Sequence, residues 1–133
     1  MYKPKKVLLI NPRNKKIRNT FPHLGLAMIS AVLKRAGHQL LVLDYLVFPT
    51  IPSINSFMKR FKPDVVGISI YSASLNEALK VIEEVKNYNV PIIIGGPHTS
   101  IHAKDLINIG VDYIVKGILV ALIKSILRQV TVA

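Results

Sequence analysis

Residues 92–98 place two glycines, a proline and a histidine directly after a run of isoleucines. The run Ile92–Ile94 has the composition of a buried strand. Glycine leaves the backbone bare and can adopt positive φ, so Gly95 and Gly96 would let a ligand approach the main chain closely. Pro97 would fix the direction of exit, and the amides of residues 99–101, at the start of a helix, could meet an anion. A tight turn that needs glycine for its geometry alone is an equally open interpretation.

Other polar residues follow apolar runs in the same way. Ser69 and Ser72 come after a third apolar run and could donate to a phosphate or an amide, although serine is also common in turns. His98 would need a carboxylate partner for acid–base work, and none lies near it in the sequence. Asp44 ends an apolar run where dinucleotide-binding proteins hold a ribose, but no Gly-x-Gly-x-x-Gly follows the first run. We therefore predict no catalytic residue and no dinucleotide site.

Cysteine and histidine usage argues against a metal site formed by side chains. The chain has no cysteine, which excludes disulfides, thiolate nucleophiles and cysteine-bound iron–sulfur or zinc centres formed by these residues. The four histidines form no tight cluster and have no carboxylate at a matching spacing. We predict that no side chain here binds a metal ion.

The net charge of +11 is concentrated in the first half of the chain. Residues 1–62 contain twelve of the eighteen lysines and arginines and one carboxylate, Asp44, whereas the rest has six basic and six acidic residues. Such a block could bind polyanions, phosphate-bearing cofactors or an acidic partner surface, or could simply be a solvated basic face. Aromatic residues do not alternate with the basic ones, so nucleic-acid binding is not expected.

Hydrophobic periodicity predicts strands that alternate with helices. The expected strands are residues 5–11, 38–44, 63–70, 90–96 and 111–117, and the expected helices are 22–34, 53–61, 74–87, 100–109 and 118–130. Lys34 to Gly37 is a typical helix end, with cations in the last turn and a terminal glycine. Ser74 and Glu77 have the spacing of a capping box at the start of the third helix.

This alternation predicts an α/β fold in a single domain of residues 1–133. Short connections give a doubly wound, five-stranded parallel sheet, flavodoxin-like (Rossmann-like), with strand order 2-1-3-4-5. Ligands bind such sheets beyond the carboxyl ends of the strands, which are here Asn11–Pro12, Ser69–Ser72, Gly95–His98 and Lys116–Gly117. No apolar run reaches the length of a membrane span, and the start does not read as a signal peptide, so we expect a cytoplasmic protein without membrane contact.

A set of motifs along this predicted edge resembles a known family. The chain resembles the cobalamin (B12)-binding domain found at the N terminus of many radical S-adenosylmethionine (SAM) enzymes. The resemblance covers residues 6 to about 117 and rests on VLLINP, PHLGL (22–26), AGHQLLVLD (36–44), KPDVVGIS (62–69), IIIGGPH (92–98) and VDYIVKG (111–117), in that order.

The resemblance implies cobalamin as cofactor and a set of residues that hold it. Gly95 to His98 would be backbone laid against the corrin ring or its nucleotide tail. The family domain holds the corrinoid while a following barrel, with a three-cysteine iron–sulfur motif, performs the radical chemistry. The implied cofactor-binding residues are Asn11, Pro12, Pro22, Gly25, Ser69, Ser72, Gly95, Gly96, Pro97, His98 and Gly117.

Three departures from the family pattern qualify this expectation. Many other B12 proteins carry Asp-x-His-x-x-Gly after the first strand, with a histidine that ligates cobalt; here His23 stands two residues before Gly25 with no such aspartate. A histidine-off mode is therefore expected. The family's last strand usually ends Gly-Glu-Gly-Glu, whereas this chain has Gly117 followed by Ile-Leu-Val. The cysteines of the catalytic barrel, and the barrel itself, are absent from this sequence.

Two functions consequently remain open at this point. One is a corrinoid-binding module, not catalytic alone, that serves a radical SAM or methyltransferase-type enzyme, which is either supplied in trans or missing from this sequence. The other is a degenerate interaction domain that keeps the flavodoxin-like fold, has lost the cofactor, and pairs as a homodimer through the apolar segment 118–123. The intact IIIGGPH motif favours the first, and the lost acids after Gly117 favour the second.

Overall fold

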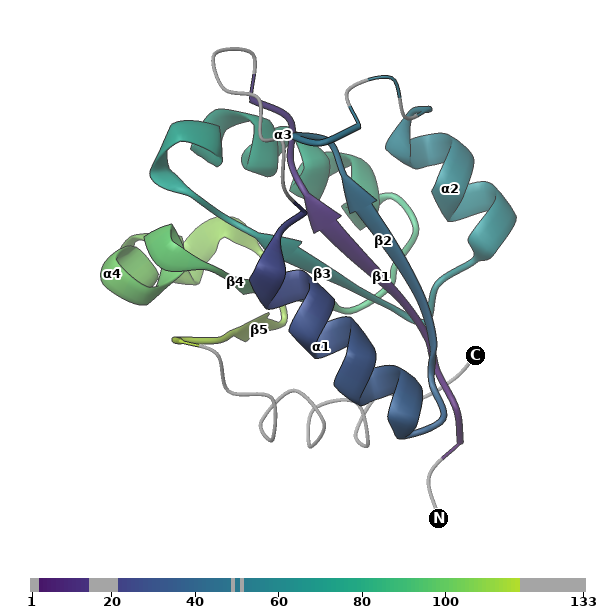
Figure 1. Cartoon of the computed structure of the whole chain (residues 1–133). Coiled ribbons are helices and arrows are strands. Elements are labelled where there is room, and N and C mark those ends of the chain that lie inside the picture. Colours follow the sequence, from purple (N-terminus) through teal and green to yellow (C-terminus); the bar gives the residue numbers. More distant parts are fainter. Residues whose placement is uncertain (1–2, 15–21, 49, 51, 118–133) are drawn as a thin grey trace.

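Five parallel strands form one sheet in the order β2-β1-β3-β4-β5, as predicted (Figure 1). The structure is a computed structural model that describes residues 3–14, 22–48, 50 and 52–117. The strands are β1 (Lys6–Asn11), β2 (Gln39–Asp44), β3 (Val65–Ser69), β4 (Ile92–Gly95) and β5 (Tyr113–Ile114). The helices are α1 (Leu24–Arg35), α2 (Ile54–Phe61), α3 (Leu75–Lys86) and α4 (Pro97–Leu106), with short 3₁₀ turns η1 (Ser72–Ser74) and η2 (Ile107–Ile109). The fold class expected from the sequence is confirmed.

The register of the sheet brings the predicted ligand-binding ends of the strands to one edge. Asn11 pairs with Asp44 across β1 and β2, and Ser69 pairs with Gly95 across β3 and β4. Because all neighbouring strands are parallel, these residues end their strands at the same side of the molecule. This edge is called the carboxyl edge below.

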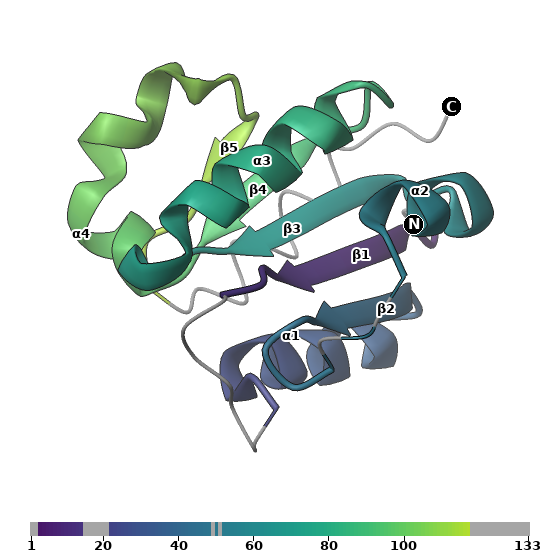
Figure 2. The ribbon, with the colours of Figure 1, turned by 90° about the horizontal axis from the view of Figure 1, so that it is seen from above.

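Helices cover both faces of the sheet (Figure 2). α1 lies on one face, and α2 and α3 lie on the other. Successive side chains along a strand point to opposite faces. Leu8 and Ile68 accordingly belong to the core under α2 and α3, whereas Val7 and Val65 belong to the core under α1.

Several element ends differ from the prediction. β5 contains two residues rather than seven, and α4 begins at Pro97 rather than near residue 100, so His98 lies in its first turn. Ser74 is the N-cap residue of α3, as predicted, but the capping box is wrong, because the Ser74 hydroxyl donates to the Tyr71 carbonyl and accepts from the Tyr71 amide and makes no bond to the helix. A serine can satisfy the turn before a helix as well as the helix itself, so the spacing alone does not distinguish the two.

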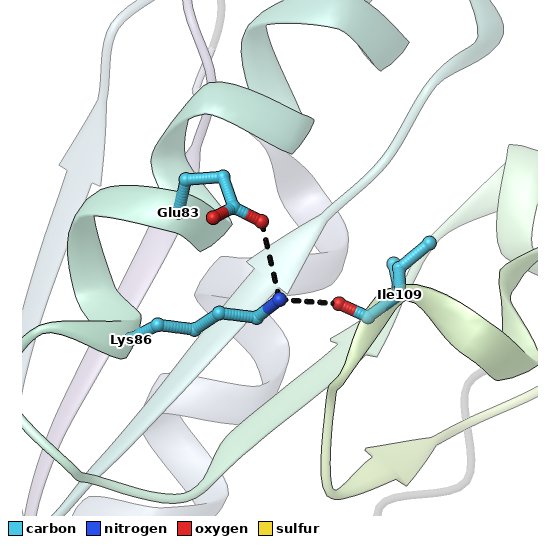
Figure 3. A network of polar contacts seen from close by, with 3 residues as sticks. All are labelled: Glu83, Lys86 and Ile109. Carbon is cyan, nitrogen blue, oxygen red and sulfur yellow. Dashed lines mark hydrogen bonds and ion pairs between the residues drawn. The ribbon is translucent and has the colours of Figure 1, made fainter.

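The end of α3 is tied to the segment that leads into β5 (Figure 3). The Lys86 ammonium donates to the Glu83 carboxylate at 3.1 Å and to the Ile109 carbonyl at 2.6 Å. Gly110 follows with φ of +83°, where a Cβ would come within 2.8 Å of the Lys86 Nζ. This lysine therefore links the end of α3 to the segment that leads into β5.

Two expectations concern the end of the chain and membranes. The predicted helix 118–130 and the proposed pairing segment 118–123 lie outside the described residues. Across the part of the chain that the structure describes, the helices are too short or too polar to cross a bilayer.

Candidate functional site

A mostly apolar cavity of about 470 Å³ lies between α1 and the sheet and opens toward the carboxyl edge. It falls within the size range of roughly 300–1,000 Å³ that is usual for small-molecule sites. Its described lining comes from β1, β3, β4, α1 and the start of α4, together with the segment after β5, and includes Leu9, His23, Gly25, Met28, Gly67, Ser69, Tyr71, Gly95, Gly96, Pro97, Ser100, Val115 and Gly117.

Two glycines in the central strands provide room for this cavity. By strand alternation, Gly67 in β3 and Gly95 in β4 occupy positions that face α1, as do Val65 and Ile93. A Cβ on Gly95 would touch Val115 at an ordinary 3.7 Å, so it would project into the cavity rather than into the protein. A Cβ on Gly67 would come within 2.8 Å of Leu9 Cδ2. Glycine within a buried strand typically marks the close approach of a ligand or another backbone.

Gly96 has a different role from its neighbour. Its φ is +101°, and a Cβ there would lie 2.7 Å from the Ile70 amide nitrogen and 2.8 Å from the Ile70 carbonyl oxygen. The turn geometry therefore requires glycine at this position, which favours the tight-turn interpretation for Gly96. The His98 amide donates to the Ile70 carbonyl and the Ser100 amide to the Gly96 carbonyl, so these amides are engaged within the protein.

His23 caps α1 and reaches across to β3. Its Nδ1 accepts from the Leu26 amide at 3.1 Å, and its Nε2 lies 2.9 Å from Ser69 Oγ and 3.2 Å from the Tyr71 hydroxyl. Because Nδ1 is an acceptor, the neutral ring carries its proton on Nε2 and donates there. Gly25 makes room for the ring, since a Cβ would lie 3.0 Å from its Cε1 atom. Both ring nitrogens are thus occupied by the protein.

Asp44 holds the start of α1 against the ends of β1 and β2. One carboxylate oxygen accepts from the His23 amide at 2.9 Å, and the other accepts from Asn11 Nδ2 at 2.9 Å and from the Leu46 amide at 3.2 Å. Asp44 and Asn11 are buried. A carboxylate with three donors in the protein is a structural anchor and does not sit where it could bind a ribose.

Burial shifts the pKa values of His23 and Tyr71, whose rings lie at the mouth of the cavity. Burial lowers the pKa of His23, and the Asp44 charge opposes this only in part. Burial also raises the pKa of Tyr71, and Asp44 raises it further. Both side chains are therefore neutral near pH 7, and the mouth presents hydroxyl and imidazole groups without charge.

The residues implied by the resemblance fall into two groups. Gly25, Ser69, Gly95, Gly96, Pro97 and Gly117 line the cavity. The others do not line it: Asn11 and Pro12 are buried at the end of β1, Pro22 is exposed before α1, and Ser72 and His98 lie beside the cavity at the carboxyl edge.

Ser72 and His98 form a pair that the sequence did not suggest. The Ser72 hydroxyl lies 2.9 Å from His98 Nδ1. The two residues are 26 positions apart, and the turn η1 and the first turn of α4 bring them together. The other described contact of the His98 ring is a tilted stack on His102 at 4.6 Å between centroids. No carboxylate among the described residues orients the His98 ring, so this pair lacks the third member that activates a nucleophile.

Sequence reasoning missed Gly67 as a residue of the site, and it did not foresee the side-chain roles of His23, Tyr71 and Ser100, which lie in segments expected at the carboxyl edge. Gly67 carried a usable signal, because a lone glycine interrupts the apolar run Val65–Ile68. Ser100 carried none: it contributes through its hydroxyl, which donates to the Gly96 carbonyl and accepts from the Gly117 amide at 2.9 Å.

Comparison with known families and sequences gives a consistent result. The family model of the B12 binding domain matches residues 11–118. An uncharacterized methyltransferase of Pyrococcus horikoshii is 32% identical over 103 residues, which is 71% of this chain and 22% of that protein. The chain thus spans under a quarter of the length of this curated relative.

Solved structures share the fold. A cobalamin-binding protein from Desulfitobacterium hafniense superposes with a TM-score of 0.66 over 97% of this chain and 60% of that one, at 16% identity. The radical SAM methyltransferase TsrM from Kitasatospora setae, with tryptophan substrate and a SAM analogue bound, gives 0.61 over 71% of this chain and 20% of that one, at 20% identity. Its structure with cobalamin and a [4Fe-4S] cluster gives 0.56 over 74% and 19%, also at 20% identity.

Proposed function

Because this chain belongs to the B12-binding domain family, with cobalamin as its cofactor, we propose that it is a corrinoid-holding module that binds cobalamin in the histidine-off mode and is not catalytic alone. The activity to which it contributes is a methyl transfer or radical reaction carried out by a radical SAM-type catalytic domain or protein. The observation that carries the proposal is the cavity under α1, where Gly95 leaves room that a side chain would fill.

The residues present fit the cofactor. A cavity of this volume would accommodate a flat part of a corrinoid, such as its nucleotide base. The apolar walls formed by Leu9, Met28 and Val115 suit an aromatic group. Ser69 and Tyr71 place hydroxyl groups at the mouth, where they can hydrogen-bond a polar edge of the ligand.

The engagement of His23 supports the histidine-off mode. An imidazole ligates a metal through a nitrogen lone pair. In His23, the Nδ1 lone pair accepts from the Leu26 amide, and Nε2 carries the proton that it donates to Ser69 or Tyr71. Ligation of cobalt by either nitrogen would break the N-cap of α1 or the contact with β3. Bound cobalamin supplies methyl-transfer chemistry at its cobalt; this chain's residues position it and exclude water from the part in the cavity.

We assign catalysis to a separate domain or protein because of the composition of this chain. A radical SAM centre needs cysteine ligands for its cluster, and these residues include no cysteine. The relatives named above as methyltransferases are several times longer than the matched region. Purified on its own, the chain should neither cleave SAM nor transfer methyl groups, and turnover by it alone would overturn this part of the proposal.

Electron paramagnetic resonance of the Co(II) form tests the histidine-off mode directly. Cob(II)alamin with an axial nitrogen ligand, whether a histidine or its own nucleotide base, shows nitrogen splitting. With the base in the cavity and His23 engaged within the protein, the bound cofactor should show none. The His23→Asn variant keeps a side-chain acceptor for the Leu26 amide and should give the same spectrum as the natural chain. Nitrogen splitting that disappears in His23→Asn would prove ligation by His23. Failure of both chains to retain cobalamin would favour the degenerate interaction domain instead.

A further inference from the structure

A second cavity of about 550 Å³ lies at the end of the sheet opposite the carboxyl edge. Its lining consists of residues at the amino-terminal ends of β1, β2 and β3, where α1 and α2 finish. The described lining residues are Pro4, Lys5, Lys6, Gly37, Gln39, Lys62 and Asp64, and this set is called the basic cavity below. Three lysines and one carboxylate give its walls a positive charge, whereas the first cavity is lined mostly by apolar groups.

Lys5 is a buried cation in the wall of the basic cavity. The residue is 3% exposed, and among the described residues the partner of its ammonium group is the Lys3 carbonyl at 3.0 Å. An ammonium group has three donors, and a buried charge is costly without an opposite charge nearby. Lys86 shows the contrast, because its ammonium meets both a carboxylate and a carbonyl. A bound anion would supply what Lys5 lacks.

Lys62 stands on the same cavity in an unusual backbone conformation. It is the C-cap of α2 with φ of +51°, a left-handed position that glycine or asparagine normally occupies. A lysine here strains the backbone, and such strain is often found where a side chain has a role in binding. The fold alone would be better served by glycine at this position.

The other charges at this end of the molecule have structural explanations. Lys34 and Arg35 end α1, and Lys59 and Arg60 lie in the last turn of α2, where cations stabilise the helix dipole. In the basic cavity itself, the Asp64 carboxylate accepts from the Lys6 amide at 2.8 Å, and the Lys6 ammonium lies 6.0 Å from the centre of the Phe61 ring. Lys62, the C-cap of α2, also lies where a cation stabilises the helix dipole, so its left-handed backbone is what sets it apart. Lys5 is the buried cation of this cavity without such an explanation.

We propose that the basic cavity binds a small phosphate-bearing anion, held by Lys5 and Lys62. The lysine ammonium groups suit phosphate as point charges. The described walls include no aromatic ring on which a nucleic-acid base could stack, and no large apolar side chain that would anchor a membrane. The site is separate from the corrinoid cavity, so it does not depend on the proposed function.

Titration of the natural chain with inorganic pyrophosphate tests the proposal, with sodium chloride matched for ionic strength. Calorimetry should give a saturable isotherm that sodium chloride does not reproduce. Lys62→Gly and Lys5→Met should each weaken the affinity by about tenfold, the effect of one charge-assisted hydrogen bond. The paired variant Lys59→Gln with Arg60→Gln removes more charge outside the cavity and should change the affinity less than about twofold.

Thermal unfolding without ligand separates binding from folding. Lys62→Gly should melt no lower than the natural chain, because glycine accepts the left-handed backbone. Weakened pyrophosphate binding in this variant therefore cannot be attributed to loss of the fold. Equal binding by the natural chain and Lys62→Gly would contradict the proposal, as would a larger loss in the Lys59/Arg60 variant. Binding of duplex DNA or of vesicles with phosphatidylserine, without binding of pyrophosphate, would also overturn it.

Discussion

The two faces of the sheet are built from the same strands and differ in what fills them. Toward α2 and α3, each central strand contributes large side chains, such as Ile68 and Ile94, that are almost fully buried. Toward α1, the residues adjacent to them in those strands are Gly67 and Gly95, and a cavity takes the place of side chains. The comparison indicates that one face stabilises the fold while the other is left open for a ligand.

Truncation of a core leucine on each face gives the largest expected effect. Leu8 faces α3 and is 0% exposed, whereas Leu9 faces α1 and lines the cavity. Leu8→Ala should lower the free energy of unfolding by about 3–4 kcal/mol, because it leaves a new void in a filled core. Leu9→Ala should cost about 2 kcal/mol or less, because part of its surface already lacks neighbours. Urea unfolding measures both, and equal losses would contradict the difference between the faces.

The adjacent glycines of β4 and its turn sharpen the comparison. Gly96→Ala should lower stability by about 2 kcal/mol, because it adds both a positive-φ residue and a Cβ 2.7 Å from the Ile70 backbone. Gly95→Ala should change stability by less than about 1 kcal/mol, because its Cβ enters the cavity. Melting temperatures of the two variants provide the measurement. A Gly95→Ala variant as unstable as Gly96→Ala would mean that the cavity does not extend to β4.

Acid should lower the stability of the protein through His23, the N-cap of α1. Burial lowers the pKa of His23 below its ordinary value of 6.5, so the unfolded chain takes up a proton before the folded chain does. Stability is therefore full above pH 6.5 and decreases as the pH falls through the folded pKa. Protonation would also place an N–H opposite the Leu26 amide at the helix start, where positive charge is unfavourable.

His23→Asn should remove this part of the acid sensitivity. Asparagine does not titrate and is a good N-cap, so at pH 7.5 the variant should lose only about 1 kcal/mol, from the missing contact between His23 and Ser69. Burial, together with the Lys5 charge, also lowers the pKa of His38, so some loss in acid should remain in the variant. Urea unfolding of both chains at pH 7.5 and pH 5 measures the difference. An unchanged pH dependence in His23→Asn would assign the effect to His38 or to carboxylates.

Removal of the Tyr71 hydroxyl gives the smallest expected effect. Tyr71→Phe loses one contact at 3.2 Å with His23 Nε2, while Ser69 keeps the shorter one at 2.9 Å. Stability should fall by about 0.5 kcal/mol or less. Ser69→Ala should cost about 1 kcal/mol, because the hydroxyl is buried. Denaturant unfolding compares the pair, and a larger loss in Tyr71→Phe would reverse the assignment of the main partner of His23.

The strands and their order followed from sequence because buried parallel strands require continuous apolar runs. VLLI, VVGIS and III are such runs, and short connections leave few ways to join them. The shape of the site was not predictable to the same degree. Gly95 and Gly96 are the same residue type, yet a Cβ is tolerated at Gly95 and clashes at Gly96. This difference arises because Val115 lies at contact distance from Gly95, whereas the Ile70 backbone lies against Gly96. Contacts between distant residues, such as His23 with Ser69, leave no local signal.

Absorption spectroscopy after incubation with hydroxocobalamin and desalting tests the central claim most directly. The natural chain should retain about one equivalent of cobalamin. Gly95→Val should fold, because a β-branched side chain suits a strand, yet retain little, because the side chain occupies the cavity. Circular dichroism provides the check on folding. Retention that is equal in both chains, or absent from the natural chain, would contradict cobalamin binding in the cavity under α1.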